Sequence, residues 1–185
     1  VISAGCGDRD DLGALGVERR VTVTPDDLVE IEAIKRLKYR YMRCLDQKLW
    51  EELATCFTAE AVAEYSGGAY SYDGREAIVD FMRSSMGATS MLTSHRVHHP
   101  EIDLVGPEEA TGVWAMEDVV VLTDVSVNVQ GAGFYSDEYV KQGGSWLIAR
   151  TGYRRSYEEL MPRGSIHGLR LTADWWSTDG RSSLA

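Results

Sequence analysis

The second half of the chain contains four successive segments that are rich in β-branched and aromatic residues. They span residues 92–105, 110–123, 131–142 and 145–157. Gly106-Pro107, a polar stretch at 124–130 and Gly143-Gly144 separate them, and residues of these types favour turns. Long strands joined by short connections are typical of an antiparallel meander, so we expect one extended sheet from this half of the chain.

The residues before the sheet predict a long amphipathic helix. Thr24-Pro25-Asp26-Asp27 has a threonine cap, a proline in the first helical position and acidic residues near the positive end of the helix dipole. This pattern predicts a helix with one buried face. Apolar residues recur every three or four positions along it, at Leu28, Ile31, Ile34, Leu37 and Tyr41.

Three shorter elements are expected between this helix and the sheet. Residues 48–57 have helical spacing, and residues 61–65 and 69–72 flank Gly67-Gly68 as in a hairpin. A further helix should follow Asp73-Gly74-Arg75-Glu76, which resembles a capping sequence. Helices followed by a curved antiparallel sheet define an α+β architecture. Such a sheet can wrap around the N-terminal helices and leave an open cone whose mouth is a natural ligand site.

The chain has 185 residues, a length typical of one domain. Residues 1–23 contain glycine and mixed charges without periodicity, so we expect a flexible N-terminal arm. Residues 24–160 should form the domain, and residues 161–185 a C-terminal extension that carries Trp175-Trp176.

Charge and composition exclude several classes of partner. The formal net charge is −10, which argues against binding nucleic acid or an anionic membrane surface. No apolar run is long enough to span a bilayer. Cys6, Cys44 and Cys56 are odd in number and lack metal-ligand spacing. Cys44 and Cys56 fall among helical apolar positions, which favours buried thiols and a reduced cytoplasmic compartment.

Two segments carry the residue types needed for proton transfer. Tyr41 and Asp46 lie near the end of the long helix, and residues 94–102 hold three of the four histidines. Tyrosine, aspartate and histidine can move a proton on and off a carbon or a hydroxyl without a cofactor. The plain alternatives are that Tyr41 is a core aromatic residue and that His95 is an ordinary strand residue. An acid near a helix C-terminus is electrostatically disfavoured, so Asp46 should lie at a turn or bind a specific partner.

The histidines also bear on metal binding. His95 and His99 share one face of a strand and His98 lies on the other, unless Pro100 shifts the register. Two histidines without a third ligand at a suitable spacing do not predict a metal site.

Strand alternation adds two charged candidates. Asp118 shares a face with Trp114 and Met116, and Arg155 has the parity of Leu147, Ala149 and Tyr153. If these faces line the cone, Asp118 and Arg155 could form an inward ion pair. The structural alternative is that each is a surface charge at a strand edge.

Motifs for nucleophilic catalysis and nucleotide binding do not occur. The chain has no Gly-x-Ser-x-Gly, no cysteine in a nucleophile context and no glycine-rich phosphate loop. Proton-transfer chemistry and plain ligand binding are the functions that this sequence leaves open.

The order of elements resembles the nuclear-transport-factor-2-like (SnoaL-like) superfamily, which includes polyketide cyclases, ketosteroid isomerases and scytalone dehydratase. Within it, residues 30–160 are most similar to the bacterial bile-acid 7α-dehydratases. The matching stretches are Ile31 to Lys38, Tyr41-Met-Arg-Cys-Leu-Asp46, Glu64-Tyr-Ser-Gly67, Ser84-Ser-Met86, His98-x-Pro-Glu-Ile102, Ala110-Thr-Gly-Val-Trp114, Glu117-Asp118, Gly133-Phe-Tyr135 and Thr151-Gly-Tyr-Arg-Arg-x-Tyr157. The similarity to scytalone dehydratase is weaker, because Val120 stands in place of its second catalytic histidine.

The resemblance implies a cone-shaped α+β barrel, a homotrimer and a hydro-lyase that uses no cofactor and no metal. It implies that His95 with Asp46 acts as the base and that Tyr41 stabilises an enolate. His99 departs from the family pattern and could alter the pocket. The other residues that the resemblance places at the active site, as support or substrate contacts, are Tyr65, Asp118 and Arg155.

Two other functions remain open from the sequence. The same groups could serve double-bond isomerisation or polyketide ring closure, because both pass through the same enolate. The domain could also bind a small molecule without catalysis, since fold alone does not give function. A bulky, largely apolar, steroid-like polycyclic compound is the expected substrate.

Overall fold

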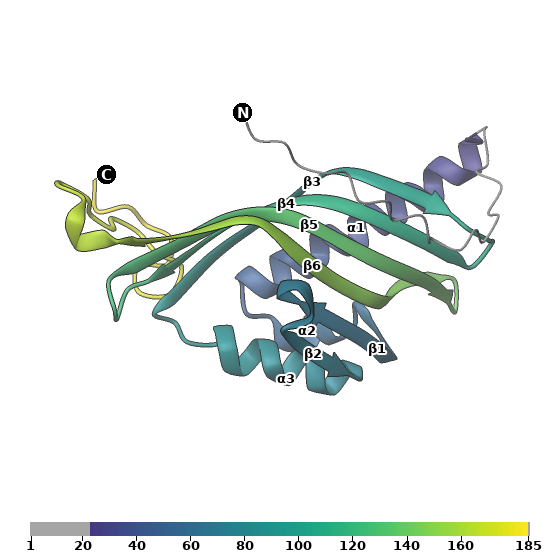
Figure 1. Ribbon diagram of the computed structural model, residues 1–185, viewed down its shortest axis with the longest axis horizontal. Coiled ribbons are helices and arrows are strands. Elements are labelled where there is room, and N and C mark those ends of the chain that lie inside the picture. Colours follow the sequence, from purple (N-terminus) through teal and green to yellow (C-terminus); the bar gives the residue numbers. More distant parts are fainter. Residues whose placement is uncertain (1–22, 185) are drawn as a thin grey trace, which may run out of the picture.

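The computed structural model describes residues 23–184 (Figure 1). The flexible arm predicted for residues 1–23 therefore lies outside the described residues, apart from its last position. The description begins directly before the first helix and includes nearly all of the predicted C-terminal extension.

The first helix, α1 (Pro25–Asp46), begins where the sequence predicts. The Thr24 side chain accepts a hydrogen bond from the Asp27 backbone N–H, and the Asp27 carboxylate accepts one from the Thr24 N–H. This reciprocal capping satisfies two backbone donors at the start of the helix. Burial begins only at Ile34, whereas Leu28 is 58% exposed, because the first turns project past the core.

The short elements that follow form one side of the fold. They are α2 (Trp50–Ala54), β1 (Phe57–Tyr65), β2 (Tyr70–Asp73) and α3 (Arg75–Met86), with a single 3-10 turn at Ser66–Gly68 inside the predicted hairpin. The capping sequence expected before α3 is wrong in its detail. Gly74 is the cap, with φ of 90°, and no side chain caps the helix. A positive φ is readily adopted only by glycine, which explains its use at this bend.

The four predicted strands are present, and the last two are longer than expected. They are β3 (Met91–Leu104), β4 (Glu109–Leu122), β5 (Val127–Gln142) and β6 (Ser145–Pro162), and successive strands pair in antiparallel order. The polar stretch predicted as a loop at 124–130 is mostly strand. Ser126, with φ of 56°, closes a tighter turn than the sequence suggested.

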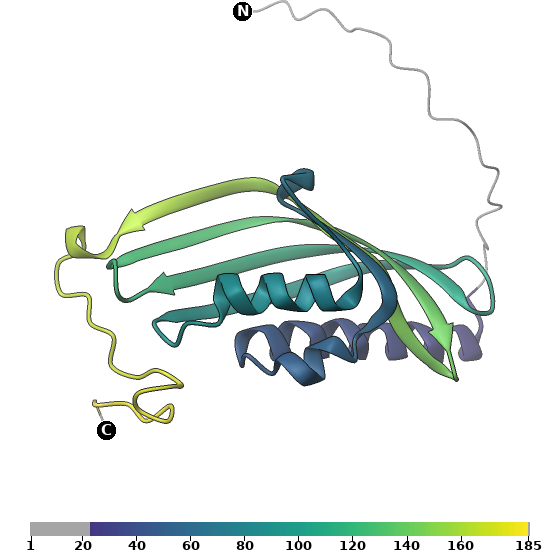
Figure 2. The same ribbon diagram turned by 90° about the horizontal axis from the view of Figure 1, so that it is seen from below.

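In the described part of the chain these strands form one six-stranded sheet in the order β2-β1-β6-β5-β4-β3. The prediction of a purely antiparallel sheet is wrong, because β1 pairs with β6 in parallel. After the hairpin, α3 carries the chain to the opposite edge, and the meander then returns to β1. The sheet curves without closing, and the helices lie against its concave side (Figures 1 and 2). The α+β, cone-like fold is confirmed.

Within residues 23–184, no helix combines the length and the apolar character required to cross a membrane.

Candidate active site

A cavity of about 140 Å³ lies between the concave face of the sheet and the helices α1 and α3. Helix α3 contributes Phe81, Met82, Ser85 and Met86 to its wall. Seven residues with polar groups reach it from the other elements: Tyr41, Tyr65, Tyr70, His95, Asp118, Tyr135 and Tyr153. Four residues proposed from the sequence, Tyr41, Tyr65, His95 and Asp118, therefore line one space.

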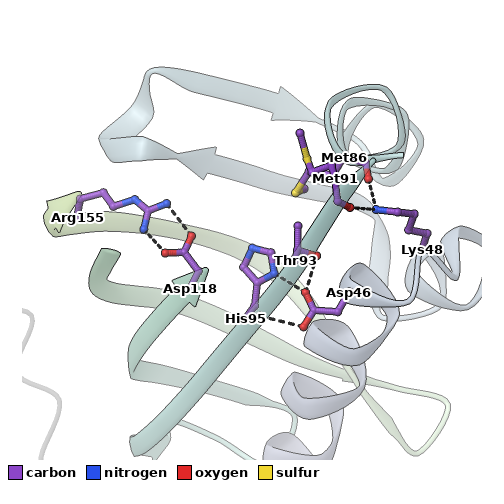
Figure 3. A network of polar contacts seen from close by, with 8 residues as sticks. All are labelled: Asp46, Lys48, Met86, Met91, Thr93, His95, Asp118 and Arg155. Carbon is purple, nitrogen blue, oxygen red and sulfur yellow. Dashed lines mark hydrogen bonds and ion pairs between the residues drawn. The ribbon is translucent and has the colours of Figure 1, made fainter. Parts of the chain in front are cut away.

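His95 and Asp46 form a tightly bonded pair at this cavity (Figure 3). The His95 Nδ1 lies 2.7 Å from Oδ1 of Asp46, and the His95 backbone N–H donates to Oδ2 at 2.9 Å. The Thr93 hydroxyl donates to Oδ1 at 2.8 Å. Because a carboxylate only accepts, the ring proton is assigned to Nδ1, and Nε2 is the nitrogen that can accept another proton.

The surroundings keep the Asp46 carboxylate charged. Burial alone would raise its pKa, but the hydrogen bonds and the charge of His95, together with Thr93, lower the pKa below its ordinary value. The side chains of His95 and Asp46 are only 11% and 23% exposed. His95 is therefore the specific partner expected for Asp46, since an acid near the C-terminus of a helix is otherwise disfavoured.

Tyr41 and Tyr65 place two phenols beside each other in the cavity wall. Their hydroxyl oxygens are 3.4 Å apart, and either can donate to the other. Burial raises the pKa of both hydroxyls, that of Tyr41 especially far, so both carry their protons at neutral pH. Two buried phenols of this kind can donate hydrogen bonds but cannot serve as bases.

Asp118 and Arg155 form the inward ion pair that strand alternation suggested. The guanidinium donates two hydrogen bonds to the carboxylate, at 2.5 and 2.7 Å, and Asp118 is 5% exposed. This bidentate pairing raises the pKa of Arg155 above its ordinary value. Gly131 faces Asp118 across the strands, and a Cβ there would lie 2.6 Å from the Tyr157 backbone oxygen and 2.8 Å from the Arg155 guanidinium. The close approach of the β6 backbone therefore requires a glycine.

Arg155 does point inward, but it does not share a face with Leu147 and Ala149 as predicted. Trp146 and Ile148 are the buried residues at the start of β6, not Leu147 and Ala149. The register shifts between Ile148 and Arg150, so that odd positions face inward afterwards. A β-bulge, which sequence alternation does not show, returns Arg155 to the core side.

His99 is placed differently from the other candidates. The register of β3 shifts between His98 and Glu101, and His99 has a φ of 47°. Its Nδ1 lies 2.6 Å from Nδ1 of His98, in an exposed position. Among the described residues His99 is not part of the cavity lining, so the structure does not bring it to the other candidates.

A second charged pair, which the sequence analysis missed, lies deeper in the fold. The Lys38 ammonium is 2.7 Å from Oδ2 of Asp137, and both side chains are completely buried. Thr151 and Tyr139 each donate to the same carboxylate at 2.6 Å. Lys38 also lies 3.6 Å from the ring centroid of Tyr135. The sequence did contain a signal for this burial. Lys38 lies four residues after Ile34 and three before Tyr41, so helical periodicity places it on the buried face of α1.

Metal binding has no support in the arrangement of donors. Within the described residues, no group of three or more His, Cys, Asp or Glu side chains is arranged to hold a metal ion. The ionisable groups at the cavity are His95, Asp118 and the tyrosines in its lining, with Asp46 and Arg155 bound to His95 and Asp118.

Comparison with known families gives a match over most of the chain. The model described as "SnoaL-like domain" matches residues 26–152, which is more than half of the 185 residues. The matched range contains Tyr41, Asp46, His95 and Asp118 and ends shortly before Arg155.

Solved structures give a consistent result. A scytalone dehydratase-like protein from Novosphingobium aromaticivorans DSM 12444 is 28% identical, with a TM-score of 0.69 over 74% of this chain and 91% of that one. Hexachlorocyclohexane dehydrochlorinase LinA-type3 from Novosphingobium barchaimii LL02 is 19% identical, with a TM-score of 0.69 over 79% of this chain and 98% of that one. At the lower identity the similarity shows the fold alone.

Proposed function

We propose that this chain, which belongs to the SnoaL-like domain family, is a lyase that removes water from a hydroxylated, carbonyl-activated small molecule without a cofactor. One observation carries the proposal. His95 lines the cavity while its Nδ1 is held by Asp46, so its other ring nitrogen is the base available to a bound substrate. The 28% identity to a scytalone dehydratase-like protein supports the lyase class.

The first step is removal of a proton from carbon. Nε2 of His95 takes a proton that the neighbouring or conjugated carbonyl has made acidic, and the electron pair moves onto the carbonyl oxygen. The Asp46 carboxylate stabilises the imidazolium that results, because its hydrogen bond to Nδ1 becomes a charge-assisted one. Asp46 also fixes the orientation of the ring through its second bond, to the His95 backbone.

The phenols stabilise the enolate. Tyr41 remains protonated and donates a hydrogen bond to the developing oxyanion, and Tyr65 supports it through their contact. A donor that is already positioned in a cavity of low polarity needs no reorganisation when the charge appears.

The second step expels the hydroxyl group. The enolate reforms the carbonyl, a carbon–carbon double bond forms, and the carbon–oxygen bond breaks. The protonated His95 returns its proton to the departing oxygen, so water leaves and the base is regenerated. The Asp118–Arg155 pair supports the wall beside His95, which is paired with Asp118 across β3 and β4, or contacts a polar end of the substrate.

The size of the cavity bears on the substrate. Ligand sites commonly enclose about 300–1,000 Å³, whereas this one encloses about 140 Å³. A compact ring compound therefore fits the cavity better than the steroid-like polycyclic substrate expected from the sequence. A polycyclic substrate requires that the wall formed by α3 move outward.

Isomerisation and ring closure are the alternative reactions of the same groups. They share the proton removal and the enolate, and they differ in whether a hydroxyl group leaves. Non-catalytic binding is disfavoured, because a binding site has no need for a buried His–Asp pair beside two protonated phenols. The predicted homotrimer and cytoplasmic location also remain proposals, and light scattering would test the former.

The test is a substrate panel with mass detection. The purified protein is incubated with compact cyclic β-hydroxy ketones, a 7α-hydroxy-3-oxo-Δ4 steroid and a Δ5-3-ketosteroid. We expect loss of one water from a hydroxylated compound, and His95→Ala should lower that rate by about 10²- to 10⁴-fold without loss of fold. Turnover of the ketosteroid alone would show an isomerase. Undiminished activity of His95→Ala would remove the basis of the proposal.

A further inference from the structure

Lys48 occupies an unusual position just beyond the end of α1. Its backbone has a φ of 56°, in the left-handed region that lysine rarely adopts. Its ammonium group donates to the carbonyl oxygen of Met86 at 2.5 Å and to that of Met91 at 3.1 Å (Figure 3). A side chain in this conformation is strained, and the conformation persists only where its surroundings fix it.

The two carbonyl groups belong to different walls of the cavity. Met86 is the last residue of α3, and Met91 is the first residue of β3, the strand that carries His95. Lys48 itself lies two residues after Asp46. One side chain therefore connects the end of α1, the end of α3 and the start of β3, which together form the corner around the His95–Asp46 pair.

Lys48 is shielded from solvent at this corner. Its side chain is half-buried, and its ammonium lies 5.6 Å from the centroid of the Trp176 ring, which belongs to the C-terminal segment. Burial lowers the pKa of Lys48, although the nearby Asp46 carboxylate opposes this effect. Hydrogen bonds to carbonyl groups are stronger in such surroundings than in water.

The helix end that Lys48 contacts forms part of the cavity wall. Ser85 and Met86, at the end of α3, line the space of about 140 Å³. Methionine side chains are flexible and adapt readily to a new shape, so displacement of this helix end would enlarge the cavity.

We propose that Lys48 is a positioning residue that determines which size of substrate the cavity admits, by holding the C-terminal end of α3 against the start of β3. The proposal rests on the proposed function in taking this cavity as the substrate site. With both carbonyl contacts in place the cavity accepts compact rings. Without them α3 moves outward at Met86, and larger ring systems enter.

Binding of two fluorescent phenols tests the proposal without requiring turnover. The probes are 2-naphthol, which is compact, and equilenin, which has a steroid skeleton. Lys48→Met should strengthen equilenin binding relative to 2-naphthol by about tenfold. The matched control is Lys35→Met, which removes an exposed lysine from α1 and should leave the ratio of the two Kd values unchanged. An unchanged ratio in Lys48→Met would overturn the proposal.

Lys48→Gly separates the side-chain contacts from the backbone conformation. Glycine adopts a positive φ without strain, so this variant removes the carbonyl contacts and the approach to Trp176, as Lys48→Met does, and also relieves the backbone. We expect it to bind the probes as Lys48→Met does. If Lys48→Gly retains the wild-type ratio while Lys48→Met does not, backbone strain and not the ammonium contacts controls the wall, and the proposal is wrong.

Hydrogen exchange gives a measurement that needs no ligand. In Lys48→Met, the backbone amides of residues 84–92 should exchange faster than in wild type and in Lys35→Met. Unchanged exchange in this segment would overturn the proposal even if neither phenol binds. Failure of the dehydratase activity, in contrast, would leave both the exchange and the probe-binding results intact.

Discussion

Among the charged pairs that join α1 to the sheet, Lys38–Asp137 and Asp46–His95 differ in their access to the cavity. Lys38 with Asp137 is completely buried, and Thr151 and Tyr139 complete the contacts of the carboxylate. Asp46 with His95 lies two helical turns further along α1. The side chains of Asp46 and His95 are 23% and 11% exposed.

This difference separates a structural role from a chemical one. A charge without access to solvent or ligand cannot exchange a proton with a substrate, and its removal leaves the partner unpaired in the core. The His95–Asp46 pair is shielded enough to strengthen its hydrogen bonds, but His95 still faces the cavity. The same helix thus fixes the fold through Lys38 and positions the proposed base through Asp46.

The largest effect on stability is expected at the buried pair. Lys38→Met leaves the Asp137 carboxylate uncompensated and should lower the free energy of unfolding by about 3–5 kcal/mol. Urea denaturation measures this loss. The double variant Lys38→Met/Asp137→Leu removes both charges and should recover part of it, because no charge is left uncompensated, although the Thr151 and Tyr139 hydroxyls lose their acceptor. A single variant as stable as wild type would contradict the structural role.

The largest effect on activity with little effect on stability is expected at the cavity pair. Asp46→Asn keeps the shape of the side chain but removes the charge that stabilises the imidazolium. We expect kcat to fall by about 10²-fold or more, while the urea midpoint changes much less than in Lys38→Met. Steady-state kinetics on the substrate found by the panel checks this. Equal losses of stability in the two variants would remove the contrast between the pairs.

The smallest effect is the pH dependence of stability contributed by Asp46. Its pKa is lower in the folded state than the ordinary value of 3.8, so the folded protein binds this proton less readily than the unfolded chain does. The contribution of Asp46 to the free energy of unfolding is complete above its ordinary pKa of 3.8 and is lost as the pH falls through the lower pKa of the folded state. The difference in free energy of unfolding between wild type and Asp46→Asn should therefore narrow below about pH 4. A constant difference down to the acid transition would show that Asp46 is not stabilised in this way.

Local patterns predicted most of the fold. Thr24, Pro25 and Asp27 fix the start of α1 through contacts within four residues, and alternation along β4 placed Asp118 beside Trp114 and Met116 on the buried face. Candidates on regular elements could be assigned a face from the sequence, because the period of a helix or strand is set by the backbone.

Irregular features limited the site prediction. The bulge in β6 gives Arg155 its inward orientation, and the register shift in β3 separates His99 from His95. Neither shift has a clear local signal. The parallel pairing of β1 with β6 was also missed, since it joins segments about ninety residues apart (Val62 with Arg150) and depends on how the whole sheet curves.

The elements, the hydrophobic faces and the residue types available for proton transfer could be read from the sequence, because they depend on backbone periodicity and short-range contacts. The fold was needed to show that Asp46 binds His95 and Asp118 binds Arg155. It was also needed to show that Lys38 is buried against Asp137 and that Lys48 contacts the end of α3. A polar side chain in the interior must find a partner. Packing brings those partners from strands and helices that are distant in the chain.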